Sequence, residues 1–145
     1  MRIVIQRCLE SKVVVEGKTV GEIQKGLNLL VCIEKEDNEE TIKKAVHKVG
    51  NIRVFEDPET GKMSFNTQAI GGKFLAISQF TLSWRGEKGH RPSFDRSMPP
   101  EEANRLFEVF CDQLSEFAPV EKGIFAADMK VKILNDGPVT FTLDF

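Results

Sequence analysis

Two hydroxyl side chains that stand close together in the sequence are the first candidates for chemistry. Ser78 and Thr81 belong to the run Ser78-Gln79-Phe80-Thr81. A serine or threonine nucleophile needs a base within hydrogen-bond reach, and none stands beside this run, although a distant residue could supply one. The alternative is that these hydroxyls satisfy free backbone groups at the end of a strand. The residue types alone favour this alternative over catalysis.

A Gly-Pro pair near the end of the chain is the second candidate. Gly137 and Pro138 lie in the run Asn135-Asp136-Gly137-Pro138-Val139-Thr140, between strand-like segments at 129–134 and 139–145. Glycine permits backbone angles that other residues avoid, and an X-Pro bond takes the cis form at a cost of only about 0.5–1 kcal/mol. The sequence therefore predicts a sharply constrained corner, whose rigid main-chain carbonyls could read the handedness of a small ligand.

Arg7 is the third candidate because of its place in the opening strand. Side chains alternate along a strand, so Arg7 shares a face with Ile3 and Ile5. If this face is buried, the guanidinium needs acceptors for its N–H donors, and main-chain carbonyls at a tight turn would provide them. The alternative is an edge-strand arginine whose stem covers apolar surface while its charged head reaches water. The sequence leaves both interpretations open.

The composition is that of one globular domain spanning residues 1–145. Hydrophobic residues make up 41% of the chain, and 11 residues are phenylalanine, which is ample material for a core. No apolar stretch approaches the roughly 20 residues of a membrane span, and the N-terminus lacks the features of a signal peptide. The odd number and wide spacing of Cys8, Cys32 and Cys111 predict buried free thiols. We therefore expect a cytoplasmic protein with no membrane partner.

One segment is locally basic, although the net charge of the chain is only -2. That net charge argues against a broadly cationic nucleic-acid binder. Within 84–96, however, basic side chains outnumber acidic ones, with Arg85, Lys88, His90, Arg91 and Arg96 against Glu87 and Asp95. The segment is a candidate patch for phosphate groups, in which His90 either contacts phosphate or faces solvent.

The remaining chemistry-bearing residues predict neither a metal site nor a cofactor. The chain has only two histidines, and His47 is interpreted as an ordinary residue of a predicted helix. The two histidines do not have the spacing of a metal pair, and no Gly-rich phosphate-binding loop is present. Most acidic residues are interpreted as solvated helix faces and turns.

The elements that must position these residues follow from periodicity and turn signals. A helix is predicted from an N-cap at Asp37, with Glu40 in capping-box position, to Gly50. A second helix is predicted from Pro99-Pro100 to a stop at Pro119. The order of elements predicts a single-domain α+β fold, with a curved, barrel-like, mostly antiparallel sheet and two packed helices. The predicted strands are 1–7, 12–16, 19–24, 27–33, 52–55, 73–80, 124–134 and 139–145.

At these residues the chain resembles the D-aminoacyl-tRNA deacylases of the widespread bacterial and eukaryotic type. The resemblance covers essentially the whole chain, and it departs from the family at Val31-Cys32-Ile33 and at Ser83-Trp84-Arg85, where the rim of the site could meet RNA differently. It rests on six motifs in one order: Ile5-Gln6-Arg7, Gly61-Lys62-Met63, Ser78-Gln79-Phe80-Thr81-Leu82, Arg91-Pro92-Ser93-Phe94, Phe125-Ala126-Ala127-Asp128-Met129 and Asn135-Asp136-Gly137-Pro138-Val139-Thr140.

The resemblance implies a homodimer whose active sites lie at the subunit interface. In the family, a cis Gly-Pro peptide reaches from one subunit into the site of the other. On that basis Gly137 and Pro138 act on the partner's site, and Arg7 holds their turn. The run Ser78-Gln79-Phe80-Thr81 lines the pocket that receives them, and Met129 is expected to take part in chiral selection.

The resemblance also implies a substrate and a catalytic strategy. The substrate is a tRNA whose 3′-terminal ribose carries a D-amino acid ester, with mischarged glycyl-tRNA as a second substrate, because fixed carbonyls would exclude only an L side chain. The ribose 2′-hydroxyl assists the attack, while backbone N–H groups around Phe80 and Thr81 stabilise the oxyanion. Acceptor phosphates would follow Arg85, Lys88, His90 and Arg91. Two alternatives stay open: a hydrolase with Thr81 as nucleophile, and a non-catalytic RNA-end-binding protein.

Overall fold

A strongly curved sheet forms the centre of the computed structural model, which describes residues 1–87 and 89–145. Strand β1 pairs antiparallel with β2, β3 and β8, whereas β3–β6 and β6–β7 are parallel. Gly21 of β2 packs against the backbone of Lys122 in β7, which brings the sheet close to a barrel. The strands are β1 (Arg2–Val15), β2 (Lys18–Ile23), β3 (Gly26–Cys32), β6 (Lys73–Ser78), β7 (Val120–Lys122) and β8 (Lys130–Asp144).

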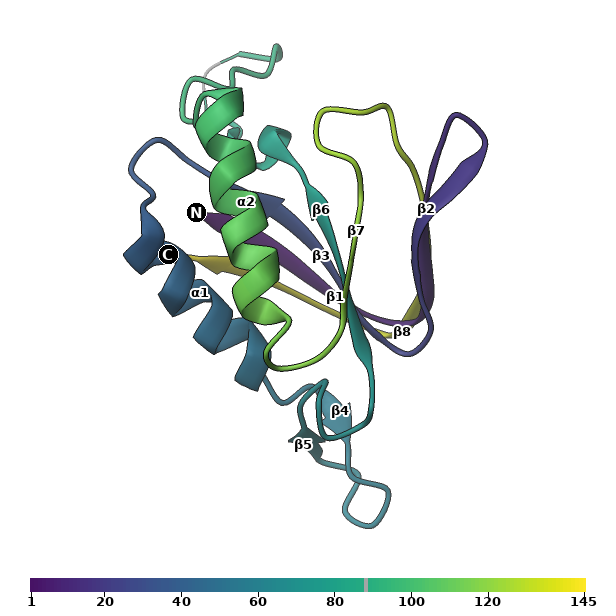
Figure 1. Ribbon diagram of the computed structural model, residues 1–145. Coiled ribbons are helices and arrows are strands. Elements are labelled where there is room, and N and C mark those ends of the chain that lie inside the picture. The colour runs from purple at the N-terminus through teal and green to yellow at the C-terminus, as the bar shows by residue number, and fades with distance from the viewer. Residues whose placement is uncertain (88) are drawn as a thin grey trace.

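Two helices, α1 (Glu39–Asn51) and α2 (Pro100–Leu114), cover one face of this sheet, as Figure 1 shows. Each helix buries one apolar stripe, because residues three and four positions apart share a face. A short hairpin of β4 (Phe55–Glu56) and β5 (Met63–Phe65) projects beyond the end of the sheet. The buried stripes are Ile42, Ala45, Val46 and Val49 in α1, and Leu106, Phe107, Phe110 and Leu114 in α2. The predicted α+β class is confirmed, and both predicted helices are present.

The start of α1 differs from the prediction by one residue. Asn38 is the N-cap, and its side-chain oxygen accepts hydrogen bonds from the backbone N–H groups of Glu40 and Thr41 at 3.0 and 3.1 Å. Asp37 instead binds the buried ammonium group of Met1 at 2.6 Å. A buried cation without a counter-ion would strongly destabilise the fold, so the Asp37 carboxylate pairs with the Met1 ammonium group rather than capping the helix.

Several predicted strand limits are also wrong. The segments predicted as 1–7 and 12–16 form the single bent strand β1, and residues 124–129 form a loop before β8 rather than the start of a strand. Strand β6 ends at Ser78, and a short 3-10 helix, η1 (Phe80–Ser83), follows it. The strand predicted at 52–55 is limited to β4.

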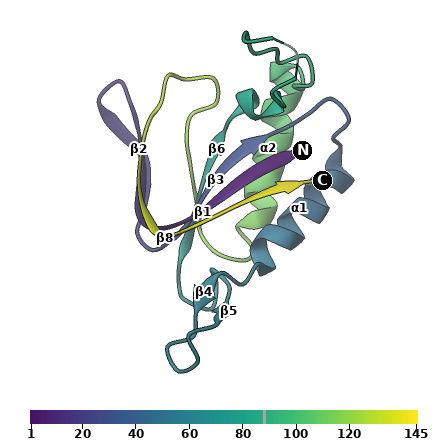
Figure 2. The same cartoon turned by 180° about the vertical axis from the view of Figure 1, so that it is seen from behind.

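The Gly-Pro pair lies inside a strand instead of dividing two. Strand β8 continues through Gly137 and Pro138, and its register against β1 shifts between Gln6 and Cys8. The Gly137–Pro138 bond is cis, and Gly137 has a φ of 113°. Proline has no N–H for the ladder, so such a pair is accommodated as an irregularity on an edge strand. Figure 2 shows β8 running alongside β1.

Two predictions from composition can be compared with the described residues. All three cysteines are free and buried, as predicted. None of the helices in the described part of the chain is long and apolar enough to cross a membrane.

Candidate active site

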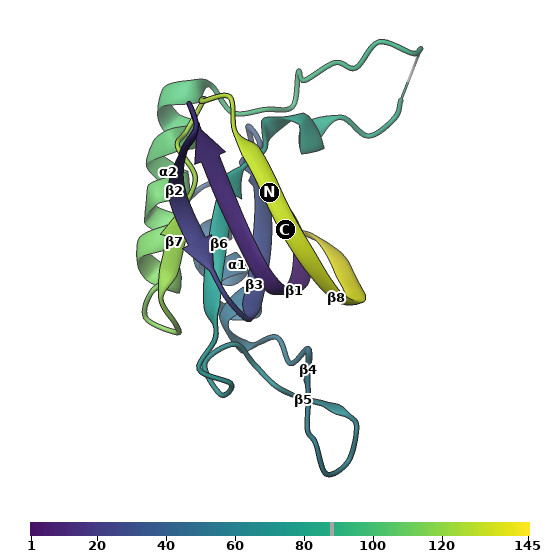
Figure 3. The same ribbon diagram turned by 90° about the vertical axis from the view of Figure 1, so that its right-hand side faces the viewer.

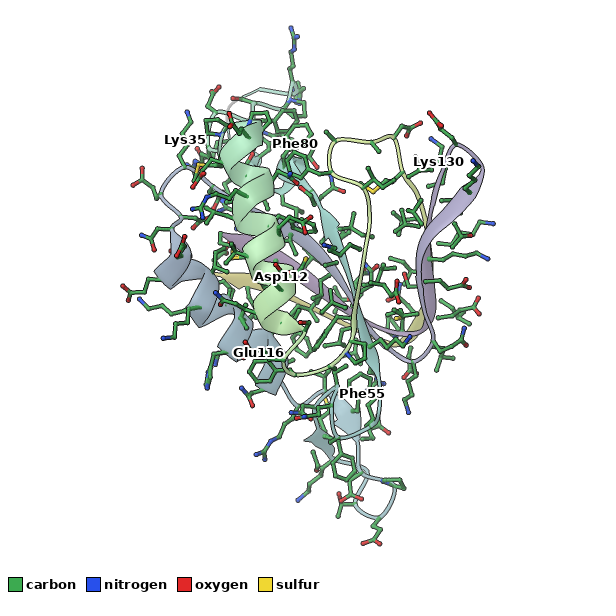
Figure 4. All side chains as sticks on the ribbon, in the orientation of Figure 1. Lys35, Phe55, Phe80, Asp112, Glu116 and Lys130 are labelled. Atoms are coloured by element: carbon green, nitrogen blue, oxygen red, sulfur yellow. The ribbon has the colours of Figure 1, made fainter. Side chains whose placement is uncertain are left out.

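The turn that follows β6 carries the predicted catalytic run. Ser78 ends the strand, and the N–H of Gln79 extends the pairing by donating to the Val31 carbonyl at 2.8 Å. The chain then turns into η1, whose first residues, Phe80 and Thr81, are exposed. Figure 4 labels Phe80, which lies beside the N-terminal end of α2. The parallel pairing of β6 with buried β3 therefore fixes where this turn lies.

A cavity of about 550 Å³ opens beside this turn. Its walls come from the end of β6, the start of α2 and the loop that precedes β8. Most of the lining side chains are apolar, and the only ionisable one among the described lining residues is Asp128, whose carboxylate binds Lys130 at 2.8 Å. The lining residues include Ser78, Gln79, Phe80, Ser97, Met98, Ala103, Phe125, Ala127 and Met129. Of the predicted pocket residues, Thr81 does not line the cavity.

Among the described residues, the hydroxyl of Thr81 has a hydrogen-bond donor beside it and no base. The Gln79 side-chain Nε2 donates to Thr81 Oγ1 at 2.6 Å. An amide is not a base at neutral pH, and neither histidine lines the cavity in the part of the chain that the structure describes. This geometry offers no group that could take the Thr81 proton, so it weakens the interpretation of Thr81 as a nucleophile.

Arg7 lies directly beneath the Gly-Pro irregularity. Its side chain is only 5% exposed. Nη1 donates to the Val54 carbonyl at 2.6 Å, and Nε lies 3.0 Å from the Asp136 carboxylate, which precedes Gly137. A Cβ atom added to Gly137 would lie 3.3 Å from Arg7 Nη2. The buried interpretation of Arg7 is therefore correct: one carbonyl accepts a hydrogen bond from its Nη1, and the Asp136 carboxylate is an ion-pair partner, whereas the buried Nε makes no hydrogen bond within the described residues.

The structure does not bring the Gly-Pro pair to the cavity of its own chain. Ser78 pairs with Val31, Val31 with Ile3, and Ile3 with Leu143. Gly137 is six positions along β8 from Leu143, which corresponds to roughly 20 Å at the rise of a strand. The two sets of predicted site residues thus lie at different ends of one sheet.

The basic segment leaves the body of the protein between η1 and α2, as Figure 3 shows. Arg85 is already engaged, because its Nη2 lies 2.8 Å from both oxygens of the Glu34 carboxylate and its Nη1 lies 3.5 Å from Asp144. His90 and Arg91 are exposed. Lys88, the remaining predicted phosphate contact, lies outside the described residues.

Sequence reasoning missed the contribution of the segment just before α2. Ser97 and Met98 line the cavity because a bridge between Glu34 and Ser97 holds this segment against the end of β3. An isolated bridge of this kind leaves no periodic signal in the sequence. The loop Phe125-Ala126-Ala127-Asp128-Met129 was recognised as a motif, but only Met129 was predicted as a site residue.

Substitution of Gly123 tests the role of Met129. A Cβ atom at Gly123 would lie 2.6 Å from Met129 Sδ, near the flexible end of that side chain. Gly123→Ala should therefore displace Met129 within the cavity and raise KM for the substrate by about tenfold, with a melting temperature within a few degrees of the parent. Met129→Ala is the comparison, because deletion of the same side chain should also raise KM if Met129 acts in the site. An unchanged KM in Gly123→Ala would contradict a role of Met129 in the site.

Known proteins similar to this chain agree with the predicted family. A family described as D-Tyr-tRNA(Tyr) deacylase matches residues 4–144. A D-aminoacyl-tRNA deacylase of Persephonella marina is 53% identical over 97% of this chain and 95% of its own length. One of Saccharophagus degradans is 53% identical over 99% of both chains. A solved structure described as c-Myc DNA Unwinding Element Binding Protein has a TM-score of 0.95 and 36% identity, and the match covers 100% of this chain and 99% of the other. The chain belongs to the D-Tyr-tRNA(Tyr) deacylase family.

Proposed function

We propose that this protein is an aminoacyl-tRNA hydrolase that cleaves the ester between a D-amino acid and the 3′-terminal ribose of tRNA. Water adds to the ester carbonyl, the bond to the ribose oxygen breaks, and tRNA and free D-amino acid are released. Membership in the family supports the reaction. The observation that carries the proposal is the cavity beside Ser78-Gln79-Phe80-Thr81, which offers space and backbone donors, and whose one ionisable side chain among the described lining residues, Asp128, is paired with Lys130.

Catalysis then depends on the positioning of the ester, on backbone N–H groups of the protein and on a hydroxyl group of the substrate. No hydrogen-bond partner for the N–H of Phe80 or Thr81 is found among the described residues. These two groups are therefore free to bind the oxyanion that forms when water adds to the ester. The ribose 2′-hydroxyl next to the ester assists the attack, because the one carboxylate among the described lining residues, Asp128, is held by Lys130.

Chiral selection requires a second copy of the chain. Gly137 and Pro138 lie far from their own cavity, so they serve the cavity of a partner subunit in a homodimer. Two observations support an interface along β8: the strand pairs only with β1 within the described chain, and it exposes large apolar side chains. A long apolar edge strand favours association with another chain. The exposed residues are Val131, Leu134 and Phe141, together with Leu9 of β1.

The partner's Gly137 and Pro138 carbonyls would stand on one side of the substrate α-carbon. An L side chain would collide with them and remove them from water, whereas a D side chain points away. Glycine has no side chain to exclude, so glycyl-tRNA is a second substrate. Exclusion of an L side chain needs a rigid Gly-Pro turn, and the ion pair between buried Arg7 and Asp136 supports this rigidity. Since the substrate is tRNA, the enzyme works in the cytoplasm.

A non-catalytic nucleic-acid-binding protein is the second candidate function. The name of the neighbour with a TM-score of 0.95 attributes DNA binding to that protein. The net charge of -2 does not favour a general nucleic-acid binder here. Release of amino acid from D-tyrosyl-tRNA, compared with L-tyrosyl-tRNA, distinguishes the two functions. We expect rapid release from the D substrate only; equal rates for both, or no release, would refute the proposal.

Exposed Arg91 is proposed to contact acceptor phosphates, and its substitution should weaken tRNA binding. Arg91→Ala should lower affinity several-fold and reduce the slope of log affinity against log salt by about one. Lys18→Ala, a change of an exposed lysine in the β1–β2 hairpin, is the matched control. The measurement is the dissociation constant of tRNA across a series of NaCl concentrations. A slope unchanged from the parent would exclude Arg91 as a phosphate contact.

A further inference from the structure

We propose that Ser97 is a positioning residue for the reaction: its hydroxyl, together with the thiol of Cys32, holds the peptide unit between Phe80 and Thr81 so that the Thr81 N–H faces the reacting ester. The inference rests on the proposed function and adds to it the residues that orient the oxyanion donor.

Two side chains bind the carbonyl oxygen of Phe80. Ser97 Oγ donates to it at 3.1 Å, and Cys32 Sγ lies 3.5 Å from it. Burial raises the pKa of Cys32 to about 11, so its thiol keeps the proton that it donates at neutral pH. The two donors come from different parts of the chain, one from the end of β3 and the other from the segment before α2.

The planar geometry of the peptide unit couples the position of the Phe80 oxygen to the direction of the Thr81 N–H. The peptide unit is planar, and its carbonyl and N–H point in opposite directions when the bond is trans. The Phe80–Thr81 bond is trans, so a fixed Phe80 oxygen also fixes the direction of the Thr81 N–H, which points away from Ser97 and Cys32. Hydrogen bonds accepted by a carbonyl also polarise the unit and strengthen its N–H as a donor.

The Ser97 hydroxyl is itself part of a relay. It lies 2.9 Å from the hydroxyl of Ser83, which is only 2% exposed. One hydroxyl carries one proton, so both contacts are satisfied when Ser83 donates to Ser97 and Ser97 donates to the Phe80 carbonyl. Ser83 is the last residue of η1 and Phe80 is the first, so the hydrogen bonds through Ser97 connect the two ends of η1.

The backbone around Ser97 is anchored firmly enough to serve as a support. The N–H of Ser97 donates to the Phe94 carbonyl at 2.9 Å, and the next N–H, of Met98, donates to the Ile33 carbonyl at 3.1 Å. Lys35 donates to the Arg96 carbonyl at 2.9 Å on the other side. The hydroxyl therefore acts from a fixed position relative to β3 and the cavity.

A pair of isosteric substitutions isolates the hydroxyl. Ser97→Thr keeps it, whereas Ser97→Val has the same shape without it, and the extended backbone at a β-bridge suits both residues. Removal of an oxyanion donor costs about 10²–10³ in kcat. In Ser97→Val the Thr81 N–H is still present, but the hydrogen bond from residue 97 to the Phe80 carbonyl is lost. The kcat of Ser97→Val on D-tyrosyl-tRNA should therefore be about tenfold below that of Ser97→Thr, with KM unchanged. Ser115→Ala, which removes a hydroxyl bound to the Asp112 carbonyl at the end of α2, is the control.

The outcomes separate this inference from the proposed function. A parent enzyme that releases no D-amino acid refutes the function itself. If the parent is active and the Thr and Val variants have the same kcat, Ser97 is not a positioning residue. A difference in KM alone would also overturn the inference, because orientation of an oxyanion donor acts on the transition state. Since the comparison is made between two variants of equal shape, a shared loss of stability does not obscure it.

Discussion

Hydrolysis should fall by about 10³-fold or more when the 2′-hydroxyl of the terminal adenosine is removed from the substrate. The substrate is a D-tyrosyl-tRNA that ends in 2′-deoxyadenosine and carries the amino acid on the 3′ oxygen. The physical reason is that Asp128, the one ionisable side chain among the described residues that line the cavity, is paired with Lys130, so the neighbouring hydroxyl of the ribose is the group best placed to assist the attack. The measurement is the single-turnover rate, corrected for spontaneous hydrolysis of each ester.

Two controls make this result decisive. The deoxy substrate should compete with the normal substrate at a similar concentration, which shows that binding is retained. Thr81→Ala should lose no more than about tenfold in rate, because the Thr81 hydroxyl faces the Gln79 amide rather than a base. Retained turnover of the deoxy substrate, combined with near-complete loss in a folded Thr81→Ala variant, would instead support Thr81 as the nucleophile.

Gly137→Ala should reduce deacylation by about 100-fold or more while the chain stays folded. A Cβ atom there would lie 2.8 Å from the Val139 side chain and 3.3 Å from Arg7 Nη2. The backbone φ of 113° is one that residues with side chains rarely adopt. The irregularity in β8 must therefore shift, and with it the carbonyls proposed to enter the partner's site. Release of amino acid from D-tyrosyl-tRNA measures the effect.

Gly17→Ala is the matched control for strain. Gly17 has a φ of 78° in the β1–β2 hairpin, and nothing lies within 4 Å of the position of its Cβ. It should lose a similar amount of backbone stability and keep full activity. Full activity of Gly137→Ala would show that the Gly-Pro irregularity takes no part in the reaction.

The fold was predictable from sequence wherever apolar side chains repeated at one regular spacing over a whole helix or strand. Both helices were predicted, because the apolar face of a helix repeats every three to four residues. Strand limits were less predictable, because β1 bends without a turn signal at 8–11 and β7 has only three residues. The N-cap moved from Asp37 to Asn38 because a long-range contact with the chain's own ammonium group outweighed a local preference.

The sequence named candidate site residues but could not give their geometry. Buried Arg7 was one of two interpretations that the sequence left open, and only the contact with Asp136 decides between them. The resemblance assigned Gly137 to the partner's site and Ser78 to the site of its own chain, and only strand register shows how far apart the two lie within one chain. Ser97 had no signal at all, because its contacts with Phe80 and Ser83 join segments that are distant in sequence.

Mixing two inactive variants tests most directly whether one subunit completes the site of the other. Gly137→Ala removes the Gly-Pro contribution, and Ala127→Trp fills the cavity while leaving β8 intact. Refolded together in equal amounts, they should recover about a quarter of the parental activity, because half of the dimers are mixed and each mixed dimer has one intact site. A mixture that stays as inactive as either variant alone, although mixed dimers are shown to form, would contradict a site shared between subunits.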